Sequence, residues 1–271
     1  MLTDRLEAFL APRANLWPRW ESHDPSSRET FDHGRWNEFL GRYVVTDGSG
    51  VNRIAYGRVR PDDKGLLEAY IDNLAGADAA RLGRREQFAF WVNLYNALTV
   101  NLVLEHFPIS SIRDIAGRTW PLLSFGPWKR KLCAVAGEPL SLSDIENRIL
   151  RPIWRDPRIH YAVNCASVGC PNLRQEAFAG VGLEAQLESA AREFVNGPRC
   201  VIEHNGRLVV SSLYNWYARD FGSGPTAVLD HISQYARTSL VNVLEGARRI
   251  DGYEYDWRLN VLGEADTGEL R

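Results

Sequence analysis

Residues able to carry out chemistry are concentrated in one short stretch of this chain. From Asp156 to Phe178 the sequence reads DPRIHYAVNCASVGCPNLRQEAF, with His160, Cys165 and Cys170 within eleven residues. A cysteine thiolate can attack an electrophilic carbon, a histidine can move the proton, and two cysteines can exchange electrons. The stretch therefore predicts a thiol reaction centre, a redox pair, or two cysteines that are only packed in a core.

Cys170 is the first candidate for a nucleophile. Pro171 suits the first turn of a helix, so we expect a helix through NLRQEAF with Cys170 at its N-cap. The sulfur would face unsatisfied backbone N–H groups and the positive end of the helix dipole, which favour the thiolate. Gly169 would let backbone or a ligand approach closely. The alternative is a partly buried cysteine that fills a turn.

The residues before Cys165 predict a strand, because RIHYAVNC alternates and is rich in β-formers. His160 and Asn164 would share one face of that strand, and Cys165 would lie on the other face, about 16 Å along the chain from His160. We therefore expect a base for either thiol to come from elsewhere in the chain, and a core position for Cys165. His160 would be either a hydrogen-bonded structural residue or a catalyst.

The spacing of the two cysteines, C-x4-C, is neither the C-x-x-C of redox proteins nor a zinc pattern. A metal site would have to recruit distant ligands such as His204. We therefore expect neither a metal nor another cofactor. A reversible disulfide between the two cysteines is sterically open.

A long helix is expected to support this region, from about Arg84 to His106, where Pro108 stops it. The helix is apolar nearly all round, which indicates burial. One arc of it carries the polar side chains of Glu86, Asn93, Asn96 and Asn101. We expect this arc either to satisfy backbone groups or to line a polar cleft that holds a substrate.

The remaining segments alternate irregularly between helices and a few short strands. Helices are predicted for GLLEAYIDNLAGAD, for SLSDIENRILRPIW with a capping box from Ser143 to Glu146, and for GLEAQLESAAREFVN. An Asn-Gly pair predicts a hairpin in CVIEHNGRLVVSS. The fold class is therefore α+β, mostly helical with a small, mainly antiparallel sheet. We expect an N-terminal helical extension over residues 1–45 and a single α+β domain over residues 46–271.

Composition argues against several classes of protein. With 271 residues, of which 45% are hydrophobic and 24% charged, the chain is an ordinary globular protein with a sizeable core. A net charge of −2 gives no reason to expect nucleic-acid binding. The most apolar segment holds too many asparagines for a membrane span, and the N-terminus does not read as a secretory signal. We therefore expect a soluble cytoplasmic protein with free thiols, and the oligomeric state is not predicted.

Several blocks of sequence together resemble one family. The blocks EQFAFWVNLYNALTVNLVLE, SLSDIENRILR, DPRIHYAVNCASVGCPNL, SSLYNWYARDF and YDWRLN are similar to the domain-of-unknown-function 547 (DUF547) family, over roughly Trp36 to Asn260. Some members occur beside thiol-exchange domains, so the resemblance implies sulfur chemistry. After the Ile-Glu pair, where the family commonly has a histidine, this chain has Asn147. A role that the histidine has in other members is therefore not expected in this chain. Outside the long helix, the matched positions include Ser141, Glu146, Asp156, Arg158, His160, Cys165, Ser167, Gly169, Cys170, Trp216, Tyr217, Asp220 and Trp257.

Three functions are compatible with these residues. The first is a thiol-dependent enzyme of hydrolase or acyl-transferase type, with Cys170, Cys165 and His160 as catalytic residues. Its architecture would be loosely similar to papain- and transglutaminase-like folds. The second is a non-catalytic module in which the polar arc of the long helix, with Trp216, Tyr217 and Trp257, forms a pocket for a small molecule or peptide. The third is a thiol-disulfide redox protein. The residues expected to contact the substrate are Glu86, Asn93, Asn96, Arg158, Asn164, Ser167, Trp216 and Asp220.

Overall fold

The computed structural model describes residues 7, 9–116, 126–222, 224–247 and 249–263. The α-helices are α2 (Gly34–Tyr43), α3 (Pro61–Gly76), α4 (Arg84–His106), α5 (Leu142–Asp144), α6 (Arg151–Trp154), α7 (Ile159–Ala162), α8 (Leu183–Val195), α9 (Leu213–Trp216), α10 (Pro225–Tyr235) and α11 (Thr238–Gly246). A π-helical segment, η5 (Ile145–Leu150), joins α5 to α6. Short 3-10 helices are η1 (Pro18–Glu21), η2 (Tyr56–Arg58), η3 (Ala79–Arg81) and η4 (Ile112–Ala116).

The strands form small separate sheets, so helices dominate the fold. The strands are β1 (Val44–Val45), β2 (Arg53–Ile54), β3 (Lys131–Val135), β4 (Glu138–Ser141), β5 (Val201–His204), β6 (Arg207–Ser211) and β7 (Gly252–Glu254). Strands β1 and β2 pair antiparallel, as do β3 and β4, while β6 pairs antiparallel with β5 and parallel with β7. The predicted class, mostly helical α+β, is confirmed.

Helix α4 is the centre of the larger hydrophobic cluster. It begins and ends where the sequence predicted, and its side chains are buried around nearly the whole circumference. It packs against α3, α5 and η5. Side chains from before residue 45, such as Trp20 and Trp36, belong to the same cluster. An apolar helix is buried on all sides because every face gains from leaving water.

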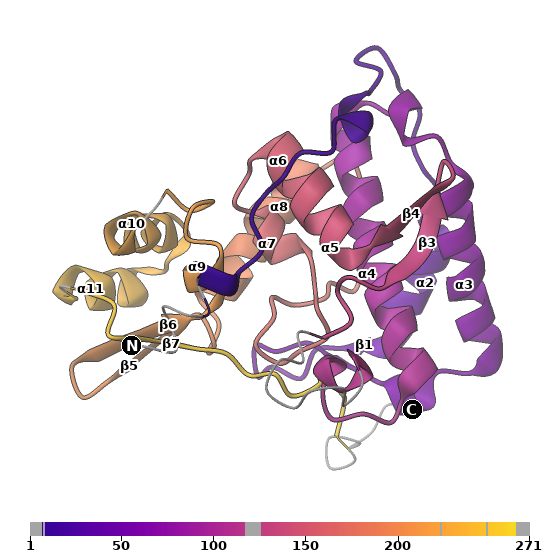
Figure 1. The fold of residues 1–271 in the computed structure, drawn as a ribbon. Helices are drawn as coiled ribbons and strands as arrows, with labels where there is room; N and C mark the ends of the chain where they lie inside the picture. Colours follow the sequence, from indigo (N-terminus) through magenta and orange to yellow (C-terminus); the bar gives the residue numbers. More distant parts are fainter. Residues whose placement is uncertain (1–6, 8, 117–125, 223, 248, 264–271) are drawn as a thin grey trace.

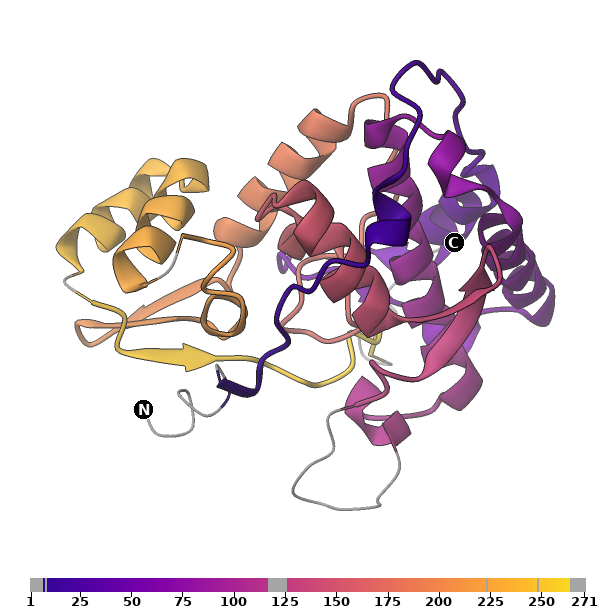
Figure 2. The same ribbon diagram turned by 45° about the horizontal axis from the view of Figure 1, so that its top comes forward.

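A second hydrophobic cluster lies at the other end of the molecule. Figures 1 and 2 both show α10, α11 and the β5–β7 sheet together at this end, with α2, α3 and α4 at the opposite end. Phe194 of α8 and Tyr214 of α9 are among its buried residues. The predicted hairpin is confirmed, because Asn205 and Gly206 connect β5 to β6 with φ angles of 53° and 72°. Positive φ at both positions is what a two-residue type I′ turn requires.

Three local predictions were wrong. The residues around His160 form the short helix α7 and no strand, because Asp156 and Pro157 begin a helical turn in which Ile159 N–H donates to the Asp156 carbonyl. Residues 171–179, all described, form no helix, so Cys170 is not a helix N-cap. The capping box begins two residues earlier than predicted, at Ser141, and its partner is Asp144.

None of the helices in the described part of the chain is both long and apolar enough to cross a membrane.

Candidate functional site

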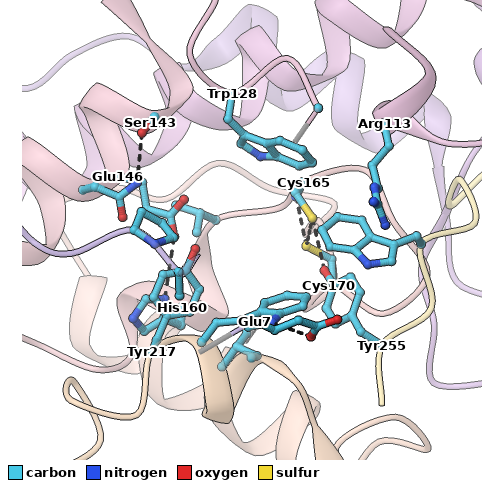
Figure 3. Close-up of a pocket in the computed structure, with 18 of the residues that line it drawn as sticks. Glu7, Arg113, Trp128, Ser143, Glu146, His160, Cys165, Cys170, Tyr217 and Tyr255 are labelled. Carbon is cyan, nitrogen blue, oxygen red and sulfur yellow. Dashed lines mark hydrogen bonds and ion pairs between the residues drawn. The ribbon is translucent and has the colours of Figure 1, made fainter. Parts of the chain in front are cut away.

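A cavity of about 610 Å³ lies between the two hydrophobic clusters and receives the three residues that the sequence marks as catalytic. Cys165, Cys170 and His160 all line it. Figure 3 shows the two cysteines on one side of the cavity and His160, with Glu146, on the other. A cavity of this size can hold a small organic ligand, since such sites occupy roughly 300–1,000 Å³.

Asn164 shapes the loop that carries the two cysteines. Its side-chain amide donates to the Pro171 carbonyl at 2.7 Å, and its side-chain oxygen accepts from Ala166 N–H at 2.9 Å. Ala166 is buried with φ of 61°, a left-handed conformation that reverses the chain. Asn164 therefore closes the loop from inside, so that Cys165 and Cys170 come together.

The C-terminal segment holds the same loop from outside. Gly169 N–H donates to the Asp256 carbonyl, and Val168 N–H donates to the Arg258 carbonyl, both at 2.8 Å. A Cβ atom on Gly169 would lie 2.8 Å from Asp256 N and 3.0 Å from the Tyr255 ring. The predicted close approach of backbone at Gly169 is confirmed, and its consequence is that Tyr255 reaches the thiols.

The two thiols are free and touch each other. Cys165 Sγ and Cys170 Sγ lie 2.9 Å apart, and Cys165 N–H donates to Cys170 Sγ, also at 2.9 Å. Cys165 Sγ is 3.1 Å from the Tyr255 hydroxyl and 3.3 Å from the Ser167 hydroxyl. Among the described residues, neither sulfur has a histidine as a hydrogen-bond partner. The neighbours of the thiol pair are nevertheless polar, and hydrogen-bond donors stabilise a thiolate.

These contacts give the two cysteines different acidities. Burial alone would raise the pKa of Cys170, but the hydrogen bonds from Cys165 and Tyr255, together with the charge of Arg199, lower it to about 7. The pKa of Cys165 is raised above its ordinary value, first by its hydrogen bond to Cys170 and then by burial. Cys170 is therefore the more acidic thiol of the pair, and Cys165 supports its ionised form.

On the opposite side of the cavity, His160 is held by two acidic residues. Its Nε2 donates to Asp220 Oδ2 at 2.7 Å, and its Nδ1 lies 3.8 Å from Glu146 Oε1. Asp220 also accepts from Arg151 at 2.6 and 3.1 Å. Although burial alone would raise the pKa of Asp220, the hydrogen bonds from His160 and Arg151 lower it well below its ordinary value. The Asp220 carboxylate fixes the orientation of the ring through Nε2–H, so Nδ1 faces Glu146.

The ring of Tyr217 packs against both His160 and Arg151. The His160 imidazole stacks on Tyr217 with ring centroids 4.1 Å apart, and the Arg151 guanidinium lies 4.6 Å from the same ring. Glu146 Oε2 accepts from the Tyr95 hydroxyl at 3.4 Å. Burial, and then the charge of Glu146, raises the pKa values of Tyr95 and Tyr217 well above the ordinary value. The hydroxyls of Tyr95 and Tyr217 therefore remain hydrogen-bond donors.

Glu146 comes from the π-helical segment η5. A π-helical turn shifts the register of the side chains along a helix and is frequent at functional sites. Here it also frees backbone carbonyls, because Asn147 O accepts from Asn15 N–H and Arg148 O from Trp17 N–H, both at 2.9 Å. The N-terminal segment is thereby fixed along the helix, and residues 10–12 line the cavity.

Several residues predicted to bind a substrate lie elsewhere. Asn93 exchanges hydrogen bonds with the backbone of Phe178, and Asn96 bonds to the backbone of Ala162 and Asn164. Glu86 accepts from backbone N–H groups of residues 31 and 180. All three are buried in α4 and outside the cavity lining. Of the two roles open to the polar arc, they perform the first, which is to satisfy backbone groups.

The other predicted contacts divide between the cavity and its supports. Trp216 lines the cavity directly. Ser167 donates to the Tyr255 hydroxyl at 2.8 Å, and Asp220 holds His160, so both act behind the lining. Arg158 pairs with Asp156 and Glu184, away from the cavity.

Some lining residues were missed as site residues. Glu146 matches the family pattern quoted above, which could have drawn attention to it, but it received no catalytic or substrate-contact role. Tyr217 and Trp257 were expected only in the recognition pocket of the non-catalytic alternative, and both line the cavity. Tyr255 is the first residue of the quoted block YDWRLN but was not named among the matched positions, and Trp128 lies outside the quoted blocks. Among the described residues, no cluster of three or more His, Cys, Asp or Glu side chains could hold a metal ion.

Comparison with known proteins identifies the family of the central segment. Residues 79–195 match the family described as "Protein of unknown function, DUF547", and the chain is therefore a DUF547 domain-containing protein. The matched segment contains Glu146, His160 and both cavity cysteines. No curated protein and no solved structure matches the chain. The expected likeness to papain- and transglutaminase-like folds is therefore without support.

Proposed function

We propose that this protein is a thiol-dependent enzyme of hydrolase or acyl-transferase type, with Cys170 as its nucleophile. The observation that carries the proposal is a sulfur with three polar hydrogen-bonding neighbours and a pKa near 7, on the lining of a cavity large enough for a substrate. Near neutral pH such a thiol is about half thiolate, which combines availability with nucleophilic strength.

The activating groups differ from those of a cysteine-histidine pair. The N–H and the thiol of Cys165, with the Tyr255 hydroxyl, support the Cys170 thiolate from the outset. No base is then needed to remove a proton during attack. His160 and Glu146, across the cavity, are free for the other proton transfer, which is to the leaving group.

The reaction proceeds in two balanced steps. Cys170 Sγ attacks the acyl carbon, the C–S bond forms, and the bond from carbon to the leaving oxygen or nitrogen breaks. The leaving group takes the proton of His160 Nδ1–H, so the imidazolium held between Asp220 and Glu146 becomes neutral. Water or an acceptor alcohol or amine then attacks the thioester, its proton passes to the neutral His160, and the Cys170 thiolate leaves.

Alkylation with iodoacetamide tests the nucleophile. In the folded protein at pH 7, Cys170 should be carbamidomethylated faster than in the urea-unfolded chain, as measured by peptide mass spectrometry. Cys200 is the internal control, because it is fully buried and burial raises its pKa to about 12. A Cys170 that reacts no faster folded than unfolded would remove the basis of the proposal.

A second candidate, thiol-disulfide exchange, is favoured by the contact of 2.9 Å between the two sulfurs. A low-pKa thiolate beside a resolving thiol is the arrangement that exchange requires. Under mild oxidation with glutathione disulfide, two of the four free thiols should disappear and a peptide linked through Cys165 and Cys170 should form. Four thiols remaining would exclude this candidate and leave the acyl-transfer proposal intact.

A further inference from the structure

Four aromatic side chains line the cavity next to the thiol pair: Trp128, Trp216, Tyr255 and Trp257, together called the aromatic wall. We propose that the aromatic wall is a subsite for a flat, uncharged aromatic group on the acyl part of the substrate. This inference rests on the proposed function, because it specifies which acyl compounds reach Cys170.

The rings of the aromatic wall form one continuous surface. Trp257 is at its centre, with ring centroids 4.6 Å from Tyr255, 5.5 Å from Trp216 and 5.7 Å from Trp128. Trp216 and Trp257 are stacked at 29°, and Trp128 meets Trp257 edge-on at 70°. These rings come from three distant parts of the sequence. Their convergence is therefore a product of the fold and not of local sequence.

The aromatic wall is only half-buried, unlike the tryptophans of the core. Trp36 and Trp91 are 1% and 0% exposed, whereas all four wall residues remain partly accessible. Large aromatic surfaces left in contact with water raise the free energy of the protein, and a ligand that covers them recovers that energy. Trp216 is also held by a hydrogen bond that its Nε1 donates to Glu7 at 3.0 Å, and Tyr255 by one that Ser167 donates to its hydroxyl. A fixed and uncovered aromatic surface is suited to binding.

Tyr255 connects the aromatic wall to the reaction centre. Its ring belongs to the wall, and its hydroxyl lies 3.1 Å from Cys165 Sγ. A group stacked on the wall therefore lies beside the sulfurs, with its acyl carbon towards Cys170 and its leaving group towards His160. Figure 3 shows Tyr255 and the cysteines close together, with Trp128 at the same side of the cavity.

The residues around the wall favour one ligand chemistry. Two cationic side chains, Arg113 and Lys129, and two carboxylates, Glu7 and Glu146, line the cavity, so the lining has no excess charge to select a charged ligand. Most of the remaining lining surface is apolar, with Leu10 and Leu213 among its residues, whereas a sugar would require a dense set of polar partners. Flat aromatic groups stack in offset or edge-on geometry on such rings.

Binding without turnover tests the subsite. The probes are 2-naphthylacetamide, acetamide, methyl glucoside and tetramethylammonium, titrated against the full chain carrying Cys170→Ala, with tryptophan fluorescence and equilibrium dialysis as readouts. The naphthyl probe should bind at least tenfold more tightly than each of the other three. Trp257→Ala should weaken it at least tenfold, and the control Trp154→Ala, outside the cavity lining, should leave it unchanged.

A protection experiment makes the test independent of these variants. In the unmodified protein, saturating 2-naphthylacetamide should slow alkylation of Cys170 at least fivefold, whereas acetamide should have no effect. Equal binding of the probes, preference for the glucoside or the cation, or no effect of Trp257→Ala on a folded variant would overturn the inference. The fluorescence experiment uses the variant without the nucleophile, so it measures probe binding independently of Cys170 reactivity. Absence of probe binding with a reactive Cys170 would overturn the subsite alone, whereas probe binding with an unreactive Cys170 would overturn the proposed function alone.

Discussion

Replacing Tyr255 with phenylalanine removes one hydroxyl from the thiol pair and keeps the ring in the aromatic wall. The hydroxyl contributes to the lowered pKa of Cys170, which is about 7. A hydrogen bond to a charged group contributes about 1.5–3 kcal/mol, and one pKa unit corresponds to about 1.4 kcal/mol. The Cys165 thiol and N–H still support the thiolate in the variant, so we use the lower limit. The pKa of Cys170 in Tyr255→Phe should then be about 8.

The effect on rate changes sign with pH. At pH 7 the thiolate fraction falls from about one half to about one tenth, while each thiolate becomes about threefold more nucleophilic because its basicity is higher. The variant should therefore react about twofold more slowly at pH 7 and about threefold faster at pH 9.5. The pH–rate profiles of the variant and the unmodified protein should therefore cross between pH 7 and pH 9.5. A loss of packing would change the rate in the same direction at both pH values.

The assay is the rate of Cys170 alkylation by iodoacetamide from pH 5 to pH 10, followed by peptide mass spectrometry. Tyr235→Phe is the matched control, because Tyr235 lies in the second hydrophobic cluster, away from the thiols. Its profile should coincide with that of the unmodified protein. A Tyr255→Phe profile with an unchanged midpoint, in a variant of unchanged melting temperature, would refute the assigned cause of the lowered pKa.

Three further substitutions test the supports of the site and fold. Gly169→Ala places a Cβ 2.8 Å from Asp256 N and should lower the free energy of unfolding by about 1–3 kcal/mol. Gly41→Ala, with no atom within 4 Å of its Cβ, should raise it by up to about 1 kcal/mol. Equal free energies of unfolding for the two variants in urea titration would contradict this. Asp220→Asn leaves the buried Arg151 side chain, 4% exposed, without its carboxylate and should cost about 3 kcal/mol, so a loss below about 1 kcal/mol by the same titration would show that Asp220 is dispensable. Burial lowers the pKa of His231 from 6.5 to about 4, so the folded state binds fewer protons than the unfolded state. The free energy of unfolding should therefore fall as pH falls from about 6.5 to 4, by at most about 3 kcal/mol. His231→Gln should flatten that part of the pH profile, and an equally steep profile would assign the loss to other groups.

The elements that the sequence predicts correctly are those with a local cause. Helix α4 is apolar all round and is followed by Pro108, so its burial and its end both follow from nearby residues. The hairpin at residues 205 and 206 has the same character, since an Asn-Gly pair is enough to select the turn. The segment around His160 shows where such reasoning fails. Its β-forming residues suggested a strand, but the Asp-Pro pair before it begins a helical turn, and tertiary packing decided between the two.

The residues of the candidate site also divide into those that the sequence indicates locally and those that only the fold brings together. Residue type alone was enough to select Cys165, Cys170 and His160, because few side chains can do their chemistry. Tyr255 could not be selected in this way, since its contact with Cys165 crosses 90 residues of sequence. Nothing near Tyr255 in the sequence specifies that a glycine 86 positions earlier will let its backbone pass.

The loop geometry also explains why this site needs neither a helix dipole nor an imidazole to favour a thiolate. Ala166, in its left-handed conformation, turns the chain back directly after Cys165, and the C-x4-C spacing then brings Cys170 Sγ over the Cys165 N–H. A single oriented N–H supplies at close range what the first turn of a helix supplies with several. The neighbouring thiol adds a second donor from the same residue. We expect a spacing one residue longer or shorter to separate the sulfur from both donors of Cys165. The spacing therefore contributes to the lowered pKa of Cys170 alongside Tyr255 and Arg199.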